Sequence, residues 1–274
     1  MSQAVPSSSL LSGDLTTLRH TRHGLMRYFR NDVFIGTALT EYGECDYLLG
    51  NALAQLVKPG ETALDIGANI GVHTLRLAEA VGPTGRVYTF EPQRLVFQVL
   101  CCNLAQNEIP NAWAYFAAVG RTNGTAKIPT PNYAQAGNYG GVSVTEGAGD
   151  SVPLMTIDSL KLDAVHLMKI DVEGMEADVL AGAKMTIKRH RPVLYLENDR
   201  KEKSPALIRL LQNADYRLWW HLPPLFNPNN HAGNKTNRFG RILSINVLAV
   251  PKERRADIRD MKEITDPDDW WKKG

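Results

Sequence analysis

The segment with the clearest chemical content combines two glycines with an acidic residue. It reads Leu64-Asp65-Ile66-Gly67-Ala68-Asn69-Ile70-Gly71. Two glycines four residues apart, directly after a short apolar run, are typical of a strand-to-helix turn whose backbone approaches a ligand. A dinucleotide fingerprint requires glycine where Asn69 stands, and the glycine-lysine pattern of triphosphate sites is missing. The turn therefore favours a nucleoside-type ligand without phosphates.

A second acidic residue supports this interpretation. Glu91 ends the next apolar run, about 24 residues beyond Gly67, where a carboxylate can accept hydrogen bonds from both ribose hydroxyls. The structural alternative is that the glycines only permit a tight turn and that Glu91 caps the following helix. The combination with Asp65 at this spacing favours the binding site.

The elements that must position these residues alternate between short apolar runs and segments with helical spacing. Strands are expected at 62–66, 86–91, 112–119, 165–170 and 193–196, and helices at 72–80, 94–106 and 176–189. This alternation predicts an α/β fold with right-handed crossovers and a mostly parallel sheet. Ligands of such sheets bind at the carboxyl ends of the strands, where Asp171 and Glu197-Asn198 follow their strands.

Two irregular stretches, 121–151 and 221–240, interrupt this alternation. The first holds six glycines, and the second holds five asparagines together with His221 and His231. Long polar loops in a compact domain are usually functional or disordered, and we expect both to shape an acceptor pocket. Either histidine could act as a base near neutral pH, although a lone loop histidine is more often simply exposed.

Composition limits the classes of function. The chain has 274 residues, 43% of them hydrophobic and 22% charged, which is typical of a globular protein. Its formal charge of +2 disfavours a nucleic-acid partner. Cys45, Cys101 and Cys102 are too few and too closely placed for a disulfide framework, and no apolar run is long enough to span a membrane. We therefore expect a cytoplasmic protein without a membrane partner.

The predicted domain organisation is an N-terminal extension at 1–40, a core domain at 41–251 and a C-terminal extension at 252–274. Both ends read as appendages of the core. Trp270 and Trp271 are expected on a C-terminal helix that covers its own core, while docking on a partner subunit in a homo-oligomer stays open.

Three segments together resemble the FkbM-type S-adenosylmethionine-dependent methyltransferases. They are Asp65-Ile66-Gly67-Ala68-Asn69-Ile70-Gly71, then Phe90-Glu91-Pro92, then Lys169-Ile170-Asp171-Val172-Glu173-Gly174-Met175-Glu176 with Val179-Leu180-Ala181-Gly182-Ala183. The resemblance extends over about 41–251. It implies a class I methyltransferase (Rossmann-like) fold, whose sheet has seven mostly parallel strands with helices on both faces, and S-adenosylmethionine as the methyl donor.

The resemblance also implies roles for individual residues. Those expected to bind the donor are Asp65, Gly67, Asn69 and Gly71 at the turn, Glu91 at the ribose, Ala118 and Val119 beside the adenine, and Asp171. Two short segments, Tyr42-Gly43-Glu44 and Asn138-Tyr139-Gly140-Gly141, also resemble family segments. Glu44 could contact the donor or the acceptor, or be a solvated acid at a helix start.

The resemblance implies a hydroxyl acceptor on a small polar metabolite such as a sugar, glycoside or polyketide. A hydroxyl must lose its proton, so a carboxylate, a histidine or a metal ion should lie nearby. Asp171 and His221 are the catalytic candidates. The Asn/Asp-Pro-Pro-aromatic motif of many amino-group methyltransferases does not follow the strand before Asp171, which favours oxygen over nitrogen.

A metal ion is one further option. Asp171, Glu197 and Asn198 could hold a divalent cation such as Mg²⁺, or else form a hydrogen-bond network without one. Three other functions stay open: a nicotinamide-dependent oxidoreductase, a noncatalytic donor-binding module, and an enzyme that methylates RNA.

Overall fold

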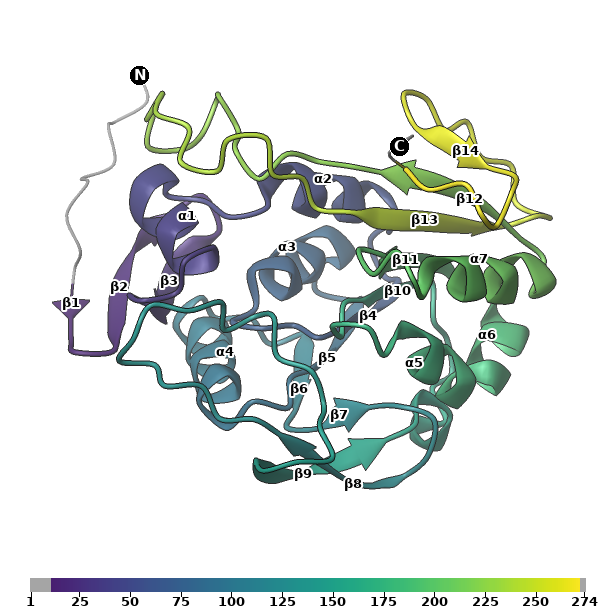
Figure 1. Cartoon of the computed structure of the whole chain (residues 1–274), viewed down its shortest axis with the longest axis horizontal. Helices are drawn as coiled ribbons and strands as arrows, with labels where there is room; N and C mark the ends of the chain where they lie inside the picture. The colour runs from purple at the N-terminus through teal and green to yellow at the C-terminus, as the bar shows by residue number, and fades with distance from the viewer. Residues whose placement is uncertain (1–10, 272–274) are drawn as a thin grey trace.

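The computed structural model describes residues 11–271, and its central feature is an eight-stranded sheet (Figure 1). The strand order is β14-β12-β13-β11-β10-β4-β5-β6. Its strands are β4 (Thr62–Ile66), β5 (Arg86–Phe90), β6 (Ala112–Tyr115), β10 (Leu167–Ile170), β11 (Val193–Glu197), β12 (Tyr216–His221), β13 (Asn246–Pro251) and β14 (Lys262–Ile264). The five strands from β11 to β6 are parallel, so their carboxyl ends meet at one edge.

The sheet differs from the expected seven-stranded form in one strand. β13 runs antiparallel to both β11 and β12, and β14 adds an antiparallel edge strand. Leu218 pairs with Ile264 at this added edge, and both side chains are buried in the main core. The chain beyond β13 thus adds an eighth strand at the β12 edge, and Ile264 of this strand contributes to the main core.

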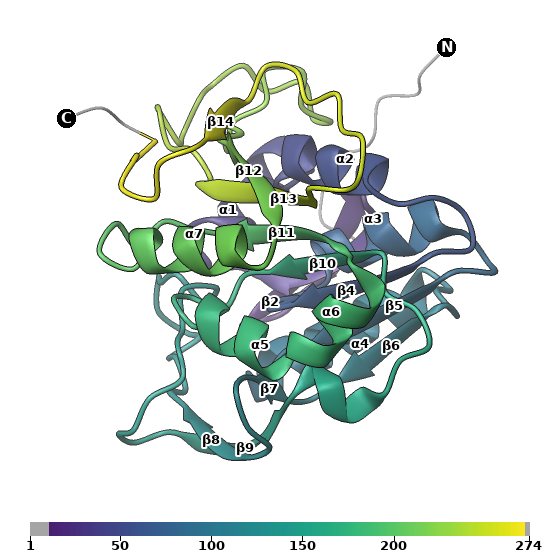
Figure 2. The ribbon, with the colours of Figure 1, turned by 90° about the vertical axis from the view of Figure 1, so that its right-hand side faces the viewer.

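Helices cover both faces of the sheet, as expected (Figure 2). Leucines of α2 (Tyr47–Gln55) and α3 (Val72–Val81) pack on one face. The other face is covered by α5 (Glu176–Gly182), α6 (Lys184–His190) and α7 (Ser204–Asn213). The 13-residue helix α4 (Arg94–Gln106) packs beside the turn that joins β4 to α3.

Two predicted elements are each divided in the structure. The expected strand at 112–119 ends with β6, and β7 (Ala118–Val119) joins a separate small sheet with β8 (Gly124–Ile128) and β9 (Asp150–Met155). The expected helix at 176–189 breaks at Ala183. Asp158, in the short helix η1 (Ile157–Leu160), accepts hydrogen bonds from Met185 and Thr186 backbone N–H groups and so starts α6 as a new helix.

The N-terminal region is more than an appendage from residue 16 onward. A small sheet of β1 (Leu11–Ser12), β2 (Thr16–Thr21) and β3 (Gly24–Phe29) precedes α1 (Ile35–Tyr42). Met26 and Tyr28 are buried against α4, whose Asn103 side chain bonds both the N–H and the carbonyl of Arg27. The boundaries at 40 and 251 stay a prediction.

The C-terminal tryptophans cover the protein's own core, but not on a helix. Trp270 contacts Trp220 of β12 with ring centroids 5.6 Å apart, and residues 265–271 form bends and turns after β14. Cys45, Cys101 and Cys102 are free thiols. Within residues 11–271, no helix has the length and apolar character needed to cross a membrane.

Candidate functional site

A cavity of about 280 Å³ lies at the carboxyl ends of β4, β5, β10 and β11. Ligand pockets span roughly 300–1,000 Å³, so this one is small. Of the predicted site residues, those that line it are Gly67, Asn69, Glu91, Ala118, Val119 and Asp171. Those outside its lining are Asp65, Gly71 and His221.

The turn at Gly67, after β4, lies against the ends of the two neighbouring strands, β5 and β10. Gly67 has a φ of 79°, and a Cβ atom there would lie 1.7 Å from the carbonyl oxygen of Asp171. The N–H groups of Gly67 and Ala68 both donate to the carbonyl of Phe90, at 3.0 and 2.9 Å. Only glycine fits at this position, because the turn lies directly on the backbone of its neighbour.

Asp65 shapes the turn from beneath and does not face the cavity. Its carboxylate is fully buried, accepts a 2.6 Å hydrogen bond from Thr74 Oγ1 and lies 3.2 Å from Lys169 Nζ. Lys169 in turn donates to the Gly67 carbonyl at 2.7 Å and lies 3.4 Å from Asp171 Oδ2. The expected donor contact of Asp65 is therefore indirect, through Lys169.

Gly71 also serves the turn and not the cavity surface. It precedes α3 with a φ of 92°, and a Cβ atom there would lie 2.6 Å from Leu100 Cδ1 of α4. Close packing of two helices explains this glycine.

Glu91 makes structural hydrogen bonds at the turn and also lines the cavity. It is 3% exposed, and its two oxygens accept backbone N–H groups of Asn69 at 3.0 Å and Gln93 at 2.8 Å. Burial raises the pKa of Glu91 to about 7, against these two hydrogen bonds, which lower it. Since each carboxylate oxygen can accept more than one hydrogen bond, Glu91 can still bind hydroxyls from the cavity.

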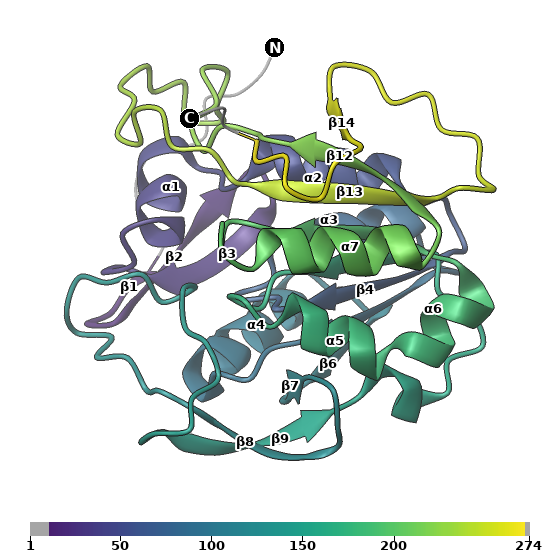
Figure 3. The ribbon, with the colours of Figure 1, turned by 45° about the vertical axis from the view of Figure 1, so that its right-hand side comes forward.

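Both irregular stretches contribute residues to the cavity lining or adjoin residues that do. Figure 3 shows their paths, in teal between β8 and β9 and in yellow-green between β12 and β13. From the first come Ile128, Asn138, Gly140, Val142 and Val144, and from the second comes Leu225, while Ile242, Leu243 and Ser244 follow directly after the second. The first is fixed beside Glu91 because Gln93 Nε2 donates to the Tyr139 carbonyl at 2.8 Å. Periodicity could not identify these residues, since neither loop has any.

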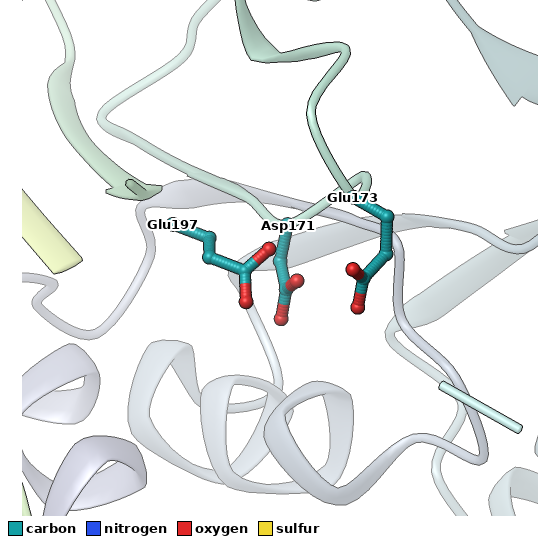
Figure 4. A group of neighbouring side chains, drawn as sticks. All are labelled: Asp171, Glu173 and Glu197. Carbon is teal, nitrogen blue, oxygen red and sulfur yellow. The ribbon is translucent and has the colours of Figure 1, made fainter. Parts of the chain in front are cut away.

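Three carboxylates of the cavity lining converge after β10 and β11 (Figure 4). Oxygens of Asp171, Glu173 and Glu197 lie within 4.8 Å of one another. Burial and the neighbouring Asp171 raise the pKa of Glu173 and, much more strongly, that of Glu197. Glu197 Oε2 is buried and has no hydrogen-bond partner among the residues described. We therefore assign the proton in this cluster to Glu197.

The cluster differs from the predicted group of Asp171, Glu197 and Asn198. Asn198 is 4% exposed and its amide donates to Ser204 Oγ at 2.9 Å, so it faces α7. Glu173 takes its place, held by Arg200 Nη2 at 2.5 Å. Glu173 has a left-handed φ of 56° and lies before α5, where it lines the cavity.

The histidines do not supply the predicted base. His221 is the last residue of β12, not a loop residue, and its Nδ1 lies 2.6 Å from the Tyr195 hydroxyl. His231 lies away from the cavity lining as well, and its backbone N–H donates to Glu44. His73 lines the cavity, but burial lowers its pKa, so it stays neutral near pH 7.

The sequence matches the model of the methyltransferase FkbM domain over residues 65–218, more than half of the chain. The chain belongs to the FkbM methyltransferase family. The matched region begins at Asp65 and includes the turn, Glu91 and the carboxylate cluster. No match was found among curated proteins.

Several solved structures are similar to this FkbM domain. A methyltransferase FkbM from Methylobacillus flagellatus is 18% identical, with TM-score 0.47, over 73% of this chain and 50% of that one. A SAM-dependent O-methyltransferase from Thermotoga maritima is 14% identical, with TM-score 0.46, over 88% of this chain and 79% of that one. A SAM-dependent methyltransferase from Aquifex aeolicus is 16% identical, with TM-score 0.38, over 78% of this chain and 92% of that one.

The charges around the cavity restrict what this FkbM domain can bind there. The described lining includes five acidic residues, Asp46, Glu91, Asp171, Glu173 and Glu197, against Lys169 as its one lysine or arginine. Lys169 is already paired with Asp65 and Asp171. A pyrophosphate would meet carboxylates with no free cation, whereas a cationic ligand without phosphates suits this lining.

Proposed function

We propose that the protein is an S-adenosylmethionine-dependent O-methyltransferase that acts on a hydroxyl of a small polar metabolite. One observation carries the proposal: a single acidic cavity joins the turn at Gly67 and Glu91 to the carboxylate of Asp171. The first two residues suit the amino-acid and ribose parts of the donor. Asp171, which lines the same cavity directly beside the turn, suits the hydroxyl that accepts the methyl group.

The lining fits the donor in charge as well. S-adenosylmethionine carries a sulfonium and an ammonium against one carboxylate, so its net charge is positive and it has no phosphate. The acidic lining supports this ligand over the nicotinamide dinucleotide of the alternative oxidoreductase. Ala118 and Val119 are almost fully buried and offer an apolar surface for the adenine.

Each cavity residue then has a defined task. The bound donor supplies an electrophilic methyl group on its sulfonium. Asp171 would orient the acceptor hydroxyl and take its proton as the oxygen forms its bond to the methyl carbon, while the carbon–sulfur bond breaks and S-adenosylhomocysteine leaves as a neutral thioether. Glu197, already protonated, cannot compete for that proton. Lys169, 3.4 Å from Asp171 Oδ2, fixes the position of the carboxylate that acts as base.

A divalent cation is the second candidate for activating the hydroxyl. Its support is the approach of three carboxylates within 4.8 Å. Against it stands the Lys169 ammonium 3.4 Å from Asp171 Oδ2, which already offsets the charge of that carboxylate. We therefore propose a reaction without a metal ion.

We also propose that the acceptor is a small molecule and not RNA, because the cavity lining is acidic and the chain carries only +2. Methyl-labelled S-adenosylmethionine, incubated with the protein and a metabolite extract of the source organism, should label a small molecule at an oxygen. Raised thermal stability with S-adenosylmethionine but not with NAD should accompany it. Donor binding without any labelled product would instead support a noncatalytic module.

A further inference from the structure

Tyr42-Gly43-Glu44 is a short segment at the end of α1 that lies next to the 222–245 loop, between β12 and β13. None of its three residues is part of the cavity lining, although Cys45 and Asp46 directly after it are. We propose that this segment is the positioning element of the acceptor wall, which we define as Leu225, Ile242, Leu243 and Ser244 of that loop. The inference rests on the proposed function, because that function makes this wall the acceptor's side of the cavity.

Glu44 is the centre of the attachment. It is 3% exposed, and its carboxylate accepts hydrogen bonds from Asn227 Nδ2 at 2.7 Å and from the His231 backbone N–H at 2.8 Å. Arg22 Nε lies 2.6 Å from the same carboxylate, and Arg22 Nη2 donates to the Asn229 carbonyl. A buried carboxylate with three donors, two of them from the loop, fixes 227–231 against the N-terminal sheet.

Tyr42 attaches the next part of the loop. Its hydroxyl donates to the Thr236 carbonyl at 2.9 Å and accepts from the Arg238 N–H at 2.8 Å. Its own carbonyl accepts from the Ala232 N–H at 2.9 Å, and its ring contacts Phe226 at 5.3 Å between centroids. The side chain is 1% exposed, so these bonds form out of contact with water.

Gly43 allows the close approach between the two segments. Its φ is 64°, and a Cβ atom there would lie 3.1 Å from Cδ2 of His231. The attached part of the loop, 226–239, lies between the two pieces of the acceptor wall, at Leu225 and at 242–244. Attachment of this middle part therefore fixes both pieces of the wall, and Glu44 acts on the acceptor only through them.

Glu44→Gln is the main test. Glutamine has one acceptor oxygen and one NH₂ group. With the NH₂ group in place of Oε2, the donors of His231 and Arg22 would face another donor and lose their hydrogen bonds. Tyr42→Phe is a milder second variant, which keeps the ring and removes only the hydroxyl. Asp158→Asn is the matched control. It makes the same acid-to-amide change at a carboxylate that also accepts three hydrogen bonds, from Met185 N, Thr186 N and Thr186 Oγ1, but in η1.

The first readout is hydrogen exchange of the loop amides in the full-length protein. Glu44→Gln should speed exchange at His231 and Ala232 by about tenfold or more, since hydrogen bonds to charged groups are strong. Tyr42→Phe should speed exchange at Arg238. Asp158→Asn should leave all three amides unchanged. Wild-type exchange rates in Glu44→Gln would overturn the proposed attachment whether or not the protein is a methyltransferase.

The second readout separates the acceptor from the donor. Initial rates of methyl transfer into serial dilutions of the metabolite extract give an apparent KM in units of dilution. Glu44→Gln should raise this KM by about fivefold or more, while the Kd of S-adenosylhomocysteine stays within twofold of wild type and Asp158→Asn changes neither. An unchanged KM would refute the link to the acceptor, whereas absence of transfer by the wild type would refute only the proposed function.

Discussion

The Lys169 ammonium donates a 2.7 Å hydrogen bond to the carbonyl oxygen of Gly67. This contact joins β10 to the turn after β4, where the donor is expected. Its side chain is 4% exposed and lies between the carboxylates of Asp65 and Asp171. The nearby carboxylates raise the pKa of Lys169 despite its burial, so the cation persists.

Lys169→Met should therefore destabilise the protein strongly. The change leaves the buried carboxylate of Asp65 without its cation, a loss of about 3–5 kcal/mol in the free energy of unfolding. Urea denaturation at pH 7 measures it. Lys252→Met is the control, because Lys252 is half exposed and its ion pair with Asp215 should contribute under about 1 kcal/mol. Equal losses in the two variants would contradict the role of Lys169.

Gly67→Ala should abolish donor binding or folding. The added Cβ would lie 1.7 Å from the Asp171 carbonyl, so the turn and β10 must separate. Gly60→Ala is matched to it, with a φ of 86° but with Thr84 Oγ1 no closer than 3.6 Å to the new atom. The control should lose about 1 kcal/mol through backbone strain and keep its affinity for S-adenosylhomocysteine by calorimetry. Tight binding by folded Gly67→Ala would disprove the assignment.

Glu91 should make stability depend on pH. Its pKa is about 7 when folded, against 4.5 for an ordinary glutamate. Both states hold the proton below pH 4.5, and only the unfolded state releases it freely between 4.5 and 7, so folding loses stability as pH rises through that window. Relative to Glu91→Gln, which does not titrate, the wild type should lose on the order of 3 kcal/mol in its free energy of unfolding as the pH rises through that window.

Chemical denaturation of both proteins at pH 4.5, 6 and 7 checks this expectation, and a constant difference would show that folding does not raise the pKa of Glu91. In the same preparation, Glu91→Ala should bind S-adenosylhomocysteine more weakly while keeping its fold. An unchanged Kd would remove Glu91 from the ribose site.

Asp171 and Glu197 should respond differently to loss of charge. Asp171→Asn removes the proposed base and should lower kcat by about 10²- to 10⁴-fold. Glu197→Gln resembles the protonated side chain already present, so it should retain more than about a tenth of wild-type turnover. The comparison uses labelled methyl transfer at saturating donor. The opposite order of effects would make Glu197 the base.

Removal of metal ions should leave methyl transfer intact. We expect full turnover after treatment with EDTA and no gain from added Mg²⁺, because the Lys169 ammonium already offsets the charge of the Asp171 carboxylate. Turnover that is lost with EDTA and restored by Mg²⁺ would establish the cation at Asp171, Glu173 and Glu197.

The central part of the fold could be predicted from the sequence because its signals are local. The strand at 62–66 and the helix at 94–106 match β4 and α4, since apolar spacing fixes which faces are buried. The division of 112–119 and the break at Ala183 depend on contacts distant in sequence. Gly182, for instance, lies so close to the Gly120 carbonyl that a Cβ atom would be 2.0 Å away.

The candidate site divides in the same way. Residues next to a strand end, such as Gly67, Glu91 and Asp171, were found because the carboxyl edge of a parallel sheet gathers them. The sequence predicts that the loop at 221–240 helps to shape an acceptor pocket. It identifies neither Glu173 nor the individual residues of the acceptor wall, since a left-handed residue and an aperiodic loop give no pattern. His221 was misplaced because β12 continues through it, and its pairing with Asn246 was not visible in the sequence.

That pairing has a consequence for how the enzyme could diversify. His221 and Asn246 are opposite one another on β12 and β13, so the intervening chain leaves and returns at adjacent points of the sheet. A segment with such stems can be lengthened, shortened or grafted without disturbing the strands, and doubling its length costs only about 0.6 kcal/mol of closure entropy. Exchange of residues 222–245 between relatives is therefore a route to new acceptors on an unchanged donor site.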